Sequence, residues 1–164
     1  MLQPTAEKPH VVIIGAGFAG LEAARALDGA PVRITLIDKE NFHLFQPLLY
    51  QVATAGLSPD DIAHPVRAIC RNQTNLTFHF NEVIHINLAE HSVQTRSGTM
   101  TYDYLIVAAG ATHNFFGMQS VAEHGYGMKT LAEAITIRNH VLTMFEQAAQ
   151  ETDADKRRSM LTFV

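Results

Sequence analysis

Apolar runs at three places along the chain predict the strands of a central β-sheet. They are residues 11–14 (VVII), 32–37 (VRITLI) and 105–109 (LIVAA), and the first and last are uninterrupted. A strand that is covered on both faces shows such continuous apolar patterning. A helical segment, 21–27, separates the first two runs, so a right-handed crossover would set them side by side in parallel. The pattern therefore predicts an α/β fold built on a Rossmann-like parallel sheet.

Shorter segments between the second and third apolar runs alternate between apolar and polar positions. Alternation of this kind predicts short strands at residues 76–80, 82–86, 91–95 and 99–102. Ser97-Gly98 is suited to a hairpin turn between the last two. We interpret these segments as a small antiparallel β-meander, inserted before the chain returns to the main sheet.

The other segments are assigned by period and by their capping residues. Helices are predicted at 48–54 (entered at Pro47), at 62–70 and at 131–149, a loop at 112–125, a charged turn at 151–158 and a strand from Ser159 onward. That last strand stops after a few apolar residues, with no element for it to lead to. The sequence is therefore expected to be an N-terminal fragment of a longer protein.

A glycine-rich turn, GAGFAG at residues 15–20, follows the first apolar run directly. Gly15 allows a sharp turn out of the strand, Gly17 leaves the backbone open to a pyrophosphate, and Gly20 allows the following helix to pack closely. The second strand ends in Asp38, where a carboxylate can accept hydrogen bonds from the hydroxyls of an adenosine ribose. Strand, turn, helix, strand and acid together predict a dinucleotide site, without choosing between NAD and FAD.

The segment from Lys39 to Pro59 follows neither a helical nor a strand period at its start, although it is largely apolar. An apolar connection needs a surface to lie against. That surface is either the protein's own sheet or the face of a large aromatic cofactor, and the pattern favours neither.

Composition excludes several classes of protein. With 47% apolar and 17% charged residues, the 164-residue chain suits a packed domain, and a net charge of −4 argues against nucleic-acid binding. The single cysteine, Cys70, allows no internal disulfide and is expected to be a small buried apolar residue. No segment has the length of a signal peptide core or a membrane span, which favours a cytosolic protein and leaves attachment to a membrane surface open.

The histidines do not predict a metal site. None of the nine pairs with another at the spacing of HExxH, and no cysteine or acid cluster accompanies them. A serine nucleophile is also unsupported, because the chain has no GxSxG elbow. No catalytic side chain and no metal ligand are therefore predicted.

Residues 41–57, NFHLFQPLLYQVATAGL, are selective enough to indicate a family. With GAGFAG, TLIDK, NEV, YDYLIVAAGATHNFFG and MKTLAEAITIRNHV, they resemble the type II NADH:quinone oxidoreductases, single-subunit flavoproteins of the respiratory chain. The resemblance extends over residues 11–164. It implies an N-terminal tail at 1–10, an incomplete FAD-binding Rossmann-type domain at 11–125, and at 126–164 a connecting helix with the first strand of a truncated NADH-binding domain.

The resemblance also implies which residues hold FAD. The glycine turn and the backbone after the returning strand would cradle the pyrophosphate, Asp38 would bind the ribose with Lys39 near the adenosine, and Val83 would contact adenine through its backbone. Gln46 and Gln51 would face the flavin. The cofactor-binding residues implied in this way are Gly15, Ala16, Gly17, Phe18, Ala19, Gly20, Asp38, Lys39, Gln46, Gln51, Val83, Ala109 and Gly110.

The activity implied for the parent protein is transfer of electrons from NADH through FAD to a membrane quinone. The fragment is expected to be inactive alone. The parent would be cytoplasmic and peripheral on the inner face of the cell membrane, attached through segments that this chain lacks, with a homodimer left open. The alternatives are a sulfide:quinone or ferredoxin-type flavoprotein reductase, and a non-catalytic nucleotide-binding redox sensor.

Overall fold

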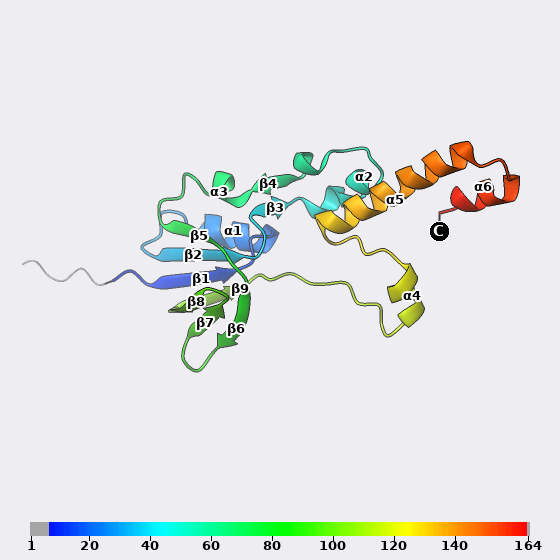
Figure 1. The fold of residues 1–164 in the computed structure, drawn as a ribbon. Coiled ribbons are helices and arrows are strands. Elements are labelled where there is room, and N and C mark those ends of the chain that lie inside the picture. Colours follow the sequence, from blue (N-terminus) through cyan, green and yellow to red (C-terminus); the bar gives the residue numbers. More distant parts are fainter. Residues whose placement is uncertain (1–6, 164) are drawn as a thin grey trace, which may run out of the picture. The chain divides into compact units, whose positions relative to one another are not determined.

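The predicted parallel sheet has four strands, in the order β5-β2-β1-β9 (Figure 1). They are β1 (His10–Ile14), β2 (Arg33–Asp38), β5 (Leu76–Phe80) and β9 (Tyr104–Val107). The computed structural model describes residues 7–163. By their contacts these residues form two units. Unit 1 runs up to His43 and resumes from His64 to Ala111, and unit 2 comprises Leu44–Ala63 and the residues from Thr112 onward. The sheet belongs to unit 1.

All pairings in this sheet are parallel. Ile13 of β1 lies between Leu36 of β2 and Ile106 of β9, and Leu36 in turn pairs with Phe78 of β5. Because the strands are parallel, their carboxyl ends meet at one edge of the sheet. The glycine turn, Asp38 and the residues after β9 all follow those ends, so this edge carries most of the predicted site.

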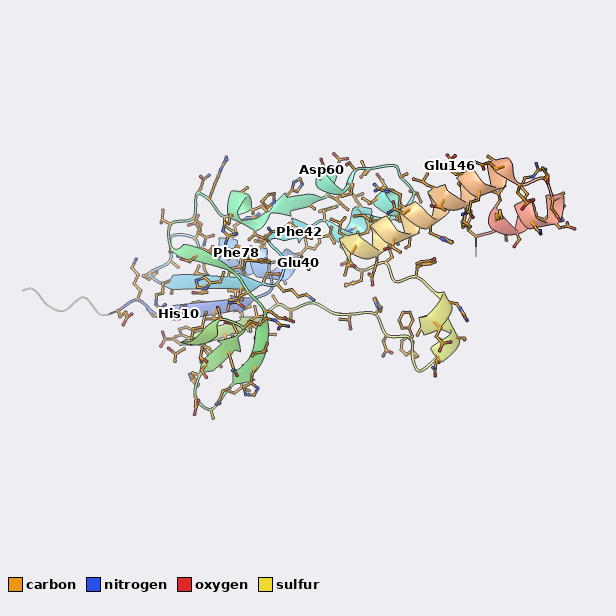
Figure 2. The ribbon with its side chains drawn as sticks, in the orientation of Figure 1. His10, Glu40, Phe42, Asp60, Phe78 and Glu146 are labelled. Carbon is orange, nitrogen blue, oxygen red and sulfur yellow. The ribbon has the colours of Figure 1, made fainter. Side chains whose placement is uncertain are left out.

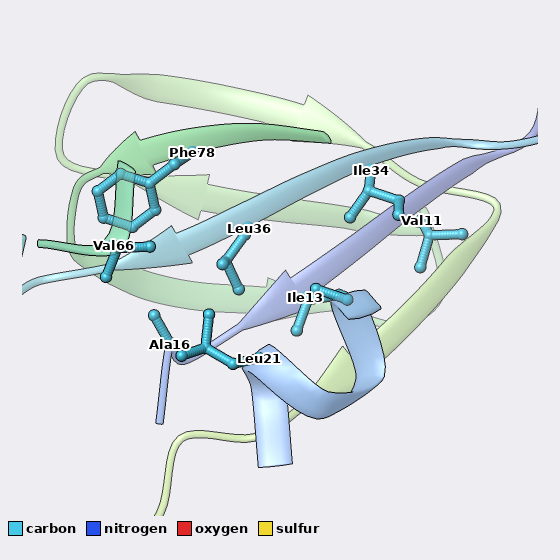
Figure 3. Packing of buried hydrophobic residues seen from close by; sticks show 9 residues of the cluster. Val11, Ile13, Ala16, Leu21, Ile34, Leu36, Val66 and Phe78 are labelled. Carbon is cyan, nitrogen blue, oxygen red and sulfur yellow. The ribbon is translucent and has the colours of Figure 1, made fainter. Parts of the chain in front are cut away.

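Both faces of β1 are buried, which explains its continuous apolar run. Val11 and Ile13 pack with Leu21 of α1 (Phe18–Ala26) on one face (Figure 3). Ala24 of α1 belongs to the same buried cluster. On the other face Val12 and Ile14 pack with residues of the meander and with Ile37, Val93 and Tyr102. The buried sheet is thus covered by a helix on one side and by the meander on the other.

The antiparallel meander consists of β6 (Val83–Asn87), β7 (Ser92–Thr95) and β8 (Gly98–Thr101). The prediction of a meander is confirmed for these three strands. It was wrong for residues 76–80, because β5 pairs in parallel with β2 and extends the main sheet. As an edge strand, β5 buries Phe78 and exposes His79 and Phe80, and this one-sided burial produced the alternation.

Two short strands, β3 (Phe42–Leu44) and β4 (Ala63–Pro65), form a sheet of their own where the chain leaves unit 1 and returns to it. Helix α3 (Val66–Ile69) follows β4. The helix predicted over 62–70 is therefore wrong in its first half. Pro65 has no backbone N–H to donate and would clash within a helix, so the helix begins only after it.

Unit 2 is helical. Its elements are η1 (Gln46–Leu48), α2 (Leu49–Ala53), η2 (Pro59–Asp61), α4 (Gln119–His124), α5 (Leu131–Gln150) and α6 (Ala154–Met160). Leu49, Val52, Ile62 and Ala134 form its buried core. The predicted helices at 48–54 and 131–149 correspond to η1 with α2 and to α5. Among residues 7–163, no helix is both long and apolar enough to cross a bilayer.

The C-terminal segment differs from its prediction. The expected charged turn and strand are instead a helix, α6, and the loop predicted at 112–125 contains α4. The Asp153 side chain caps α6 by accepting hydrogen bonds from the N–H groups of Asp155 (2.9 Å) and Lys156 (3.2 Å). Helical residues bond within their own segment, whereas a strand at 159–163 would need a neighbouring strand. Val164 and residues 1–6 of the predicted tail lie outside the described residues, and His10 already belongs to β1.

Candidate functional site

The glycine turn is connected to the ends of three strands. The Gly15 N–H donates to the carbonyl of Ile37, and the N–H of Ala108 donates to the carbonyl of Ile14, both at 2.7 Å. Gly15 has a φ of +102°, which side-chain-bearing residues rarely adopt. The turn is therefore held by backbone bonds from β2 and from the residues that follow β9.

Two glycines of the turn are required by the packing of the chain itself. A Cβ atom at Gly15 would lie 2.2 Å from the carbonyl oxygen of Ala108, and one at Gly20 would lie 1.7 Å from the carbonyl oxygen of Gly15. Both distances are far below van der Waals contact. These glycines bring the turn, α1 and the segment after β9 into direct backbone contact.

Gly17 is different, because a Cβ atom placed there would meet no atom of the described chain within 4 Å. Its φ of −73° is also accessible to any residue. Neither packing nor backbone strain of this chain therefore requires a glycine here. Gly17 precedes α1, whose first turn offers N–H groups with no acceptor inside the helix. The turn thus leaves an approach to backbone donors open to a ligand.

Asp38 points into the turn from the end of β2. One carboxylate oxygen accepts the Ala16 N–H at 2.5 Å, and the other accepts the Glu40 N–H at 2.8 Å. A carboxylate has about four acceptor positions, so each oxygen can still accept a hydroxyl proton. The side chain is half-buried and remains reachable from solvent.

Other predicted residues of unit 1 lie around this edge. The N–H of Asn81 donates to the carbonyl of Asp38 at 2.8 Å, which brings the start of β6 and Val83 to the end of β2. Lys39 is exposed in the bend after β2. The Ala109 nitrogen is 3.2 Å from the Cβ position built at Gly15, and Gly110 follows with a φ of +73°. The structure therefore gathers the predicted unit 1 residues at the carboxyl edge of the sheet.

Gln46 and Gln51 belong to unit 2, and each has a partner there. The Lys129 ammonium donates to Gln46 Oε1 at 3.1 Å, and Gln51 Nε2 donates to the Tyr50 hydroxyl at 2.9 Å. Gln46 lies in η1 and Gln51 in α2. Within unit 2, both side chains are half-buried.

Two residues at the turn were missed by the sequence analysis. Ala108 supplies the carbonyl that faces Gly15, and the Ala-Ala-Gly ending of the strand was its only signal. His43 donates from Nδ1 to the carbonyl of Ala16 at 3.1 Å, and its ring meets that of Phe18 edge-on at 4.9 Å. No periodic signal in the segment around His43 could have revealed this contact.

His10 is a buried polar residue of unit 1 with partners inside the fold. His10 is buried at the start of β1 (Figure 2), where Nδ1 donates to the Thr101 carbonyl and Nε2 faces the Thr35 hydroxyl, both at 2.7 Å. Burial lowers the pKa of His10, and burial raises the pKa of the Cys70 thiol. Among residues 7–163, no group of three or more His, Cys, Asp or Glu side chains could hold a metal ion.

The chain is similar in sequence to known proteins. The sequence model of the pyridine nucleotide-disulphide oxidoreductase family matches residues 9–149. Two type II NADH:quinone oxidoreductases of Mycobacterium tuberculosis are 45% and 49% identical over 98% and 94% of the chain. The chain spans only 36% and 34% of their respective lengths.

Solved structures also resemble the chain. The NDH2 structure of Plasmodium falciparum in complex with RYL-552 aligns with a TM-score of 0.82 at 24% identity, covering 92% of this chain and 32% of that one. The sulfide:quinone oxidoreductase of Aquifex aeolicus aligns with a TM-score of 0.75 at 26% identity, covering 84% and 32%. At 24% identity, the first likeness supports the fold alone.

Proposed function

The chain belongs to the pyridine nucleotide-disulphide oxidoreductase family, and on that premise we propose that it forms the FAD-binding part of an NADH:quinone oxidoreductase. Its similarity to the two mycobacterial enzymes supports this reaction class. The selective sequence at 41–57 supports the same assignment. Because the chain covers about a third of those enzymes, the complete reaction is proposed for the longer protein and not for this chain alone.

The observation that carries the proposal is the contrast among the three glycines. Gly15 and Gly20 are required by contacts inside the chain, whereas Gly17 has open space where a side chain would be. A pyrophosphate approaching the N-terminus of α1 would occupy that space and accept from the amides of Gly17 and Ala19. A ligand therefore accounts for a glycine that the fold does not need.

The other site residues take their proposed roles from this arrangement. Asp38 accepts the ribose hydroxyls, and its negative charge disfavours a dinucleotide with a 2′-phosphate. Ala16, Phe18 and Gly20 complete the turn, and Ala109 and Gly110 bring bare backbone beside it. Lys39 lies near the adenosine, and Val83 contacts adenine through its backbone. Gln46 and Gln51 are proposed to face the flavin.

When bound, the flavin would supply the redox chemistry, which takes a hydride from NADH and passes two electrons on to a quinone. The chain supplies binding and orientation. We assign no acid, base or nucleophile to its side chains. Attachment of the longer protein to the membrane surface, where the quinone resides, is part of the proposal.

A titration of the purified 164-residue chain with FAD tests the binding role. The flavin fluorescence should be quenched on binding, and Asp38→Asn should weaken FAD about tenfold or more, since hydrogen bonds to a charged group contribute ~1.5–3 kcal/mol. Asp28→Asn removes the same charge from an exposed position after α1 and should leave the affinity unchanged. Absence of FAD binding, or equal effects of the two variants, would contradict the proposal.

A second assay concerns activity. The chain alone should not oxidise NADH with a soluble quinone, because it covers only a third of its relatives. Measurable turnover would show that this part suffices. The longer protein should turn over, and its failure to do so would favour a redox sensor.

A sulfide:quinone oxidoreductase is the competing enzyme, since one such structure is similar in fold and sequence. That chemistry would need redox cysteines. The chain has only Cys70, and burial raises the pKa of its thiol, which disfavours the reactive thiolate. Cys70 is therefore a poor candidate for that redox chemistry, and the 45% and 49% identity to two NADH:quinone oxidoreductases supports NADH oxidation instead.

A further inference from the structure

Ala16, at the centre of the glycine turn, is held from both sides by side chains. Its N–H donates to the Asp38 carboxylate at 2.5 Å, and its carbonyl accepts from His43 Nδ1 at 3.1 Å. Asp38 ends β2, while His43 lies in β3, so the two side chains come from different elements. Ala16 itself is almost fully buried, with 2% of its surface exposed. The two peptide groups that flank Ala16 are thus each held by a side chain of unit 1: Asp38 binds the Gly15–Ala16 group and His43 binds the Ala16–Gly17 group.

The bond from His43 determines the direction of a neighbouring donor. A trans peptide group is planar, so the carbonyl of Ala16 and the N–H of Gly17 point in opposite directions. By holding the carbonyl toward itself, His43 turns the Gly17 N–H away, toward the opposite side of the turn. Gly17 is the position where the chain leaves space open. The imidazole therefore orients a donor that it does not itself contact.

The contact also determines which nitrogen of the His43 ring carries a proton. A carbonyl oxygen only accepts, so Nδ1 must carry the proton, whether the imidazole is neutral or charged. The edge-on contact with Phe18, at 4.9 Å and 88°, holds the ring in this orientation. Phe18 is the first residue of α1, so the same histidine touches the turn at two points.

We propose that His43 is a positioning residue for the dinucleotide phosphate, which holds the Ala16–Gly17 peptide so that the Gly17 N–H faces the bound pyrophosphate. This inference rests on the proposed FAD-binding function. His43 does not touch the cofactor in this role. Its effect is to set the direction of a backbone donor before the ligand arrives, which spares the ligand the cost of ordering it.

Three variants separate the hydrogen bond from the ring contact. His43→Phe keeps an aromatic ring beside Phe18 but removes the donor, whereas His43→Asn places an amide N–H₂ near the position of Nδ1 and removes the ring. His85→Ala, at an exposed position on β6, serves as the histidine control. In FAD titrations we expect His43→Phe to bind about fivefold more weakly, since a hydrogen bond contributes ~1 kcal/mol. His43→Asn should recover most of the affinity.

The outcomes distinguish this inference from the function on which it rests. If the wild-type chain binds no FAD, the proposed function fails and this inference fails with it. If the wild-type chain binds FAD and His43→Phe binds equally well, only the inference is overturned. An equal loss of affinity in His43→Phe and His43→Asn would show that restoring an N–H donor does not restore binding, and would also overturn the inference.

NMR of the chain without FAD gives a readout that does not depend on the cofactor. The ¹⁵N shifts of the His43 side chain should show a protonated Nδ1, and the Gly17 amide signal should move in His43→Phe but return toward its original position in His43→Asn. An unprotonated Nδ1 would exclude the bond to Ala16 and overturn the inference. An unmoved Gly17 signal in His43→Phe would do the same.

Discussion

The contrast between Gly20 and Gly17 predicts that substitution by alanine lowers stability at Gly20 and weakens FAD binding at Gly17. Gly20→Ala would place a methyl group 1.7 Å from the carbonyl oxygen of Gly15. Ordinary contact requires ~3.5 Å, so α1 and the turn would have to separate by more than about 1.5 Å. The carbonyl oxygen of Gly15 is a backbone atom and the new Cβ atom is bonded directly to the backbone, so no rotamer change can relieve the clash. The cost should reach the upper end of the range for overpacking, ~3 kcal/mol of unfolding free energy.

Gly17→Ala should behave differently. The new methyl group would meet no atom of the described chain within 4 Å, and the φ of −73° suits alanine. Alanine lowers the conformational entropy of the unfolded chain, which should stabilise the folded state by ~0.4–1 kcal/mol. Alanine is a poorer helix N-cap than glycine by a comparable amount, so the two effects should nearly cancel. Its effect should appear in FAD binding instead, as a loss of at least about tenfold, equivalent to ~1.4 kcal/mol.

Urea unfolding of the chain without FAD measures the loss of unfolding free energy. The transition is followed through the amide NMR signals of β1 and β2, so that unit 1 is observed directly. With m values of ~1–3 kcal/mol/M, Gly20→Ala should lower the midpoint by roughly 1–3 M. Gly17→Ala should leave the midpoint nearly unchanged. An FAD titration of each folded variant measures the change in FAD affinity. Equal midpoints for the two variants, or unchanged FAD affinity in Gly17→Ala, would refute the reasoning.

Three further predictions concern individual side chains. Burial lowers the pKa of His10 below its ordinary 6.5, so the neutral ring contributes fully to stability above pH ~6.5. That contribution should decline as the pH falls toward the folded-state pKa. The urea midpoints at pH 7.5 and 5.5 should therefore differ less in His10→Gln than in the wild type. Burial raises the pKa of Cys70, so a disulfide reagent at pH 7.5 should modify it several-fold more slowly than free glutathione, and urea should abolish the difference. The Thr130 hydroxyl caps α5 by accepting the Glu133 N–H at 3.3 Å, so Thr130→Ala should cost ~1 kcal/mol in thermal or urea unfolding, whereas Thr130→Ser should restore it.

Patterns along the chain were sufficient to predict elements whose burial follows one regular pattern from end to end. The run at 11–14 predicted a strand buried on both faces, and β1 lies between two clusters of buried side chains. The periodicity of 131–149 matched α5, which starts at the same residue and ends one residue later. The glycine turn and Asp38 were also predicted from spacing, because their geometry depends on the strands that immediately precede them.

Other assignments depended on partners that are distant in sequence. Residues 76–80 alternate like a meander strand, yet β5 pairs with β2, more than thirty residues earlier. Alternation reports only that one side is exposed, and an edge strand of a parallel sheet satisfies that condition as well. The segment at 159–163 is apolar enough for a strand, but Asp153 caps a helix that ends there instead.

The sequence by itself determined that a strand, a glycine turn, a helix and an acid follow one another at a dinucleotide-binding spacing, since each of these depends on residues close along the chain. Only the tertiary structure decided which glycines the fold requires and which it leaves open, because the atoms that crowd Gly15 belong to Ala108. It also decided that His43 reaches the carbonyl of Ala16. Such contacts join residues brought together by the parallel sheet, and no local pattern encodes the distance between them.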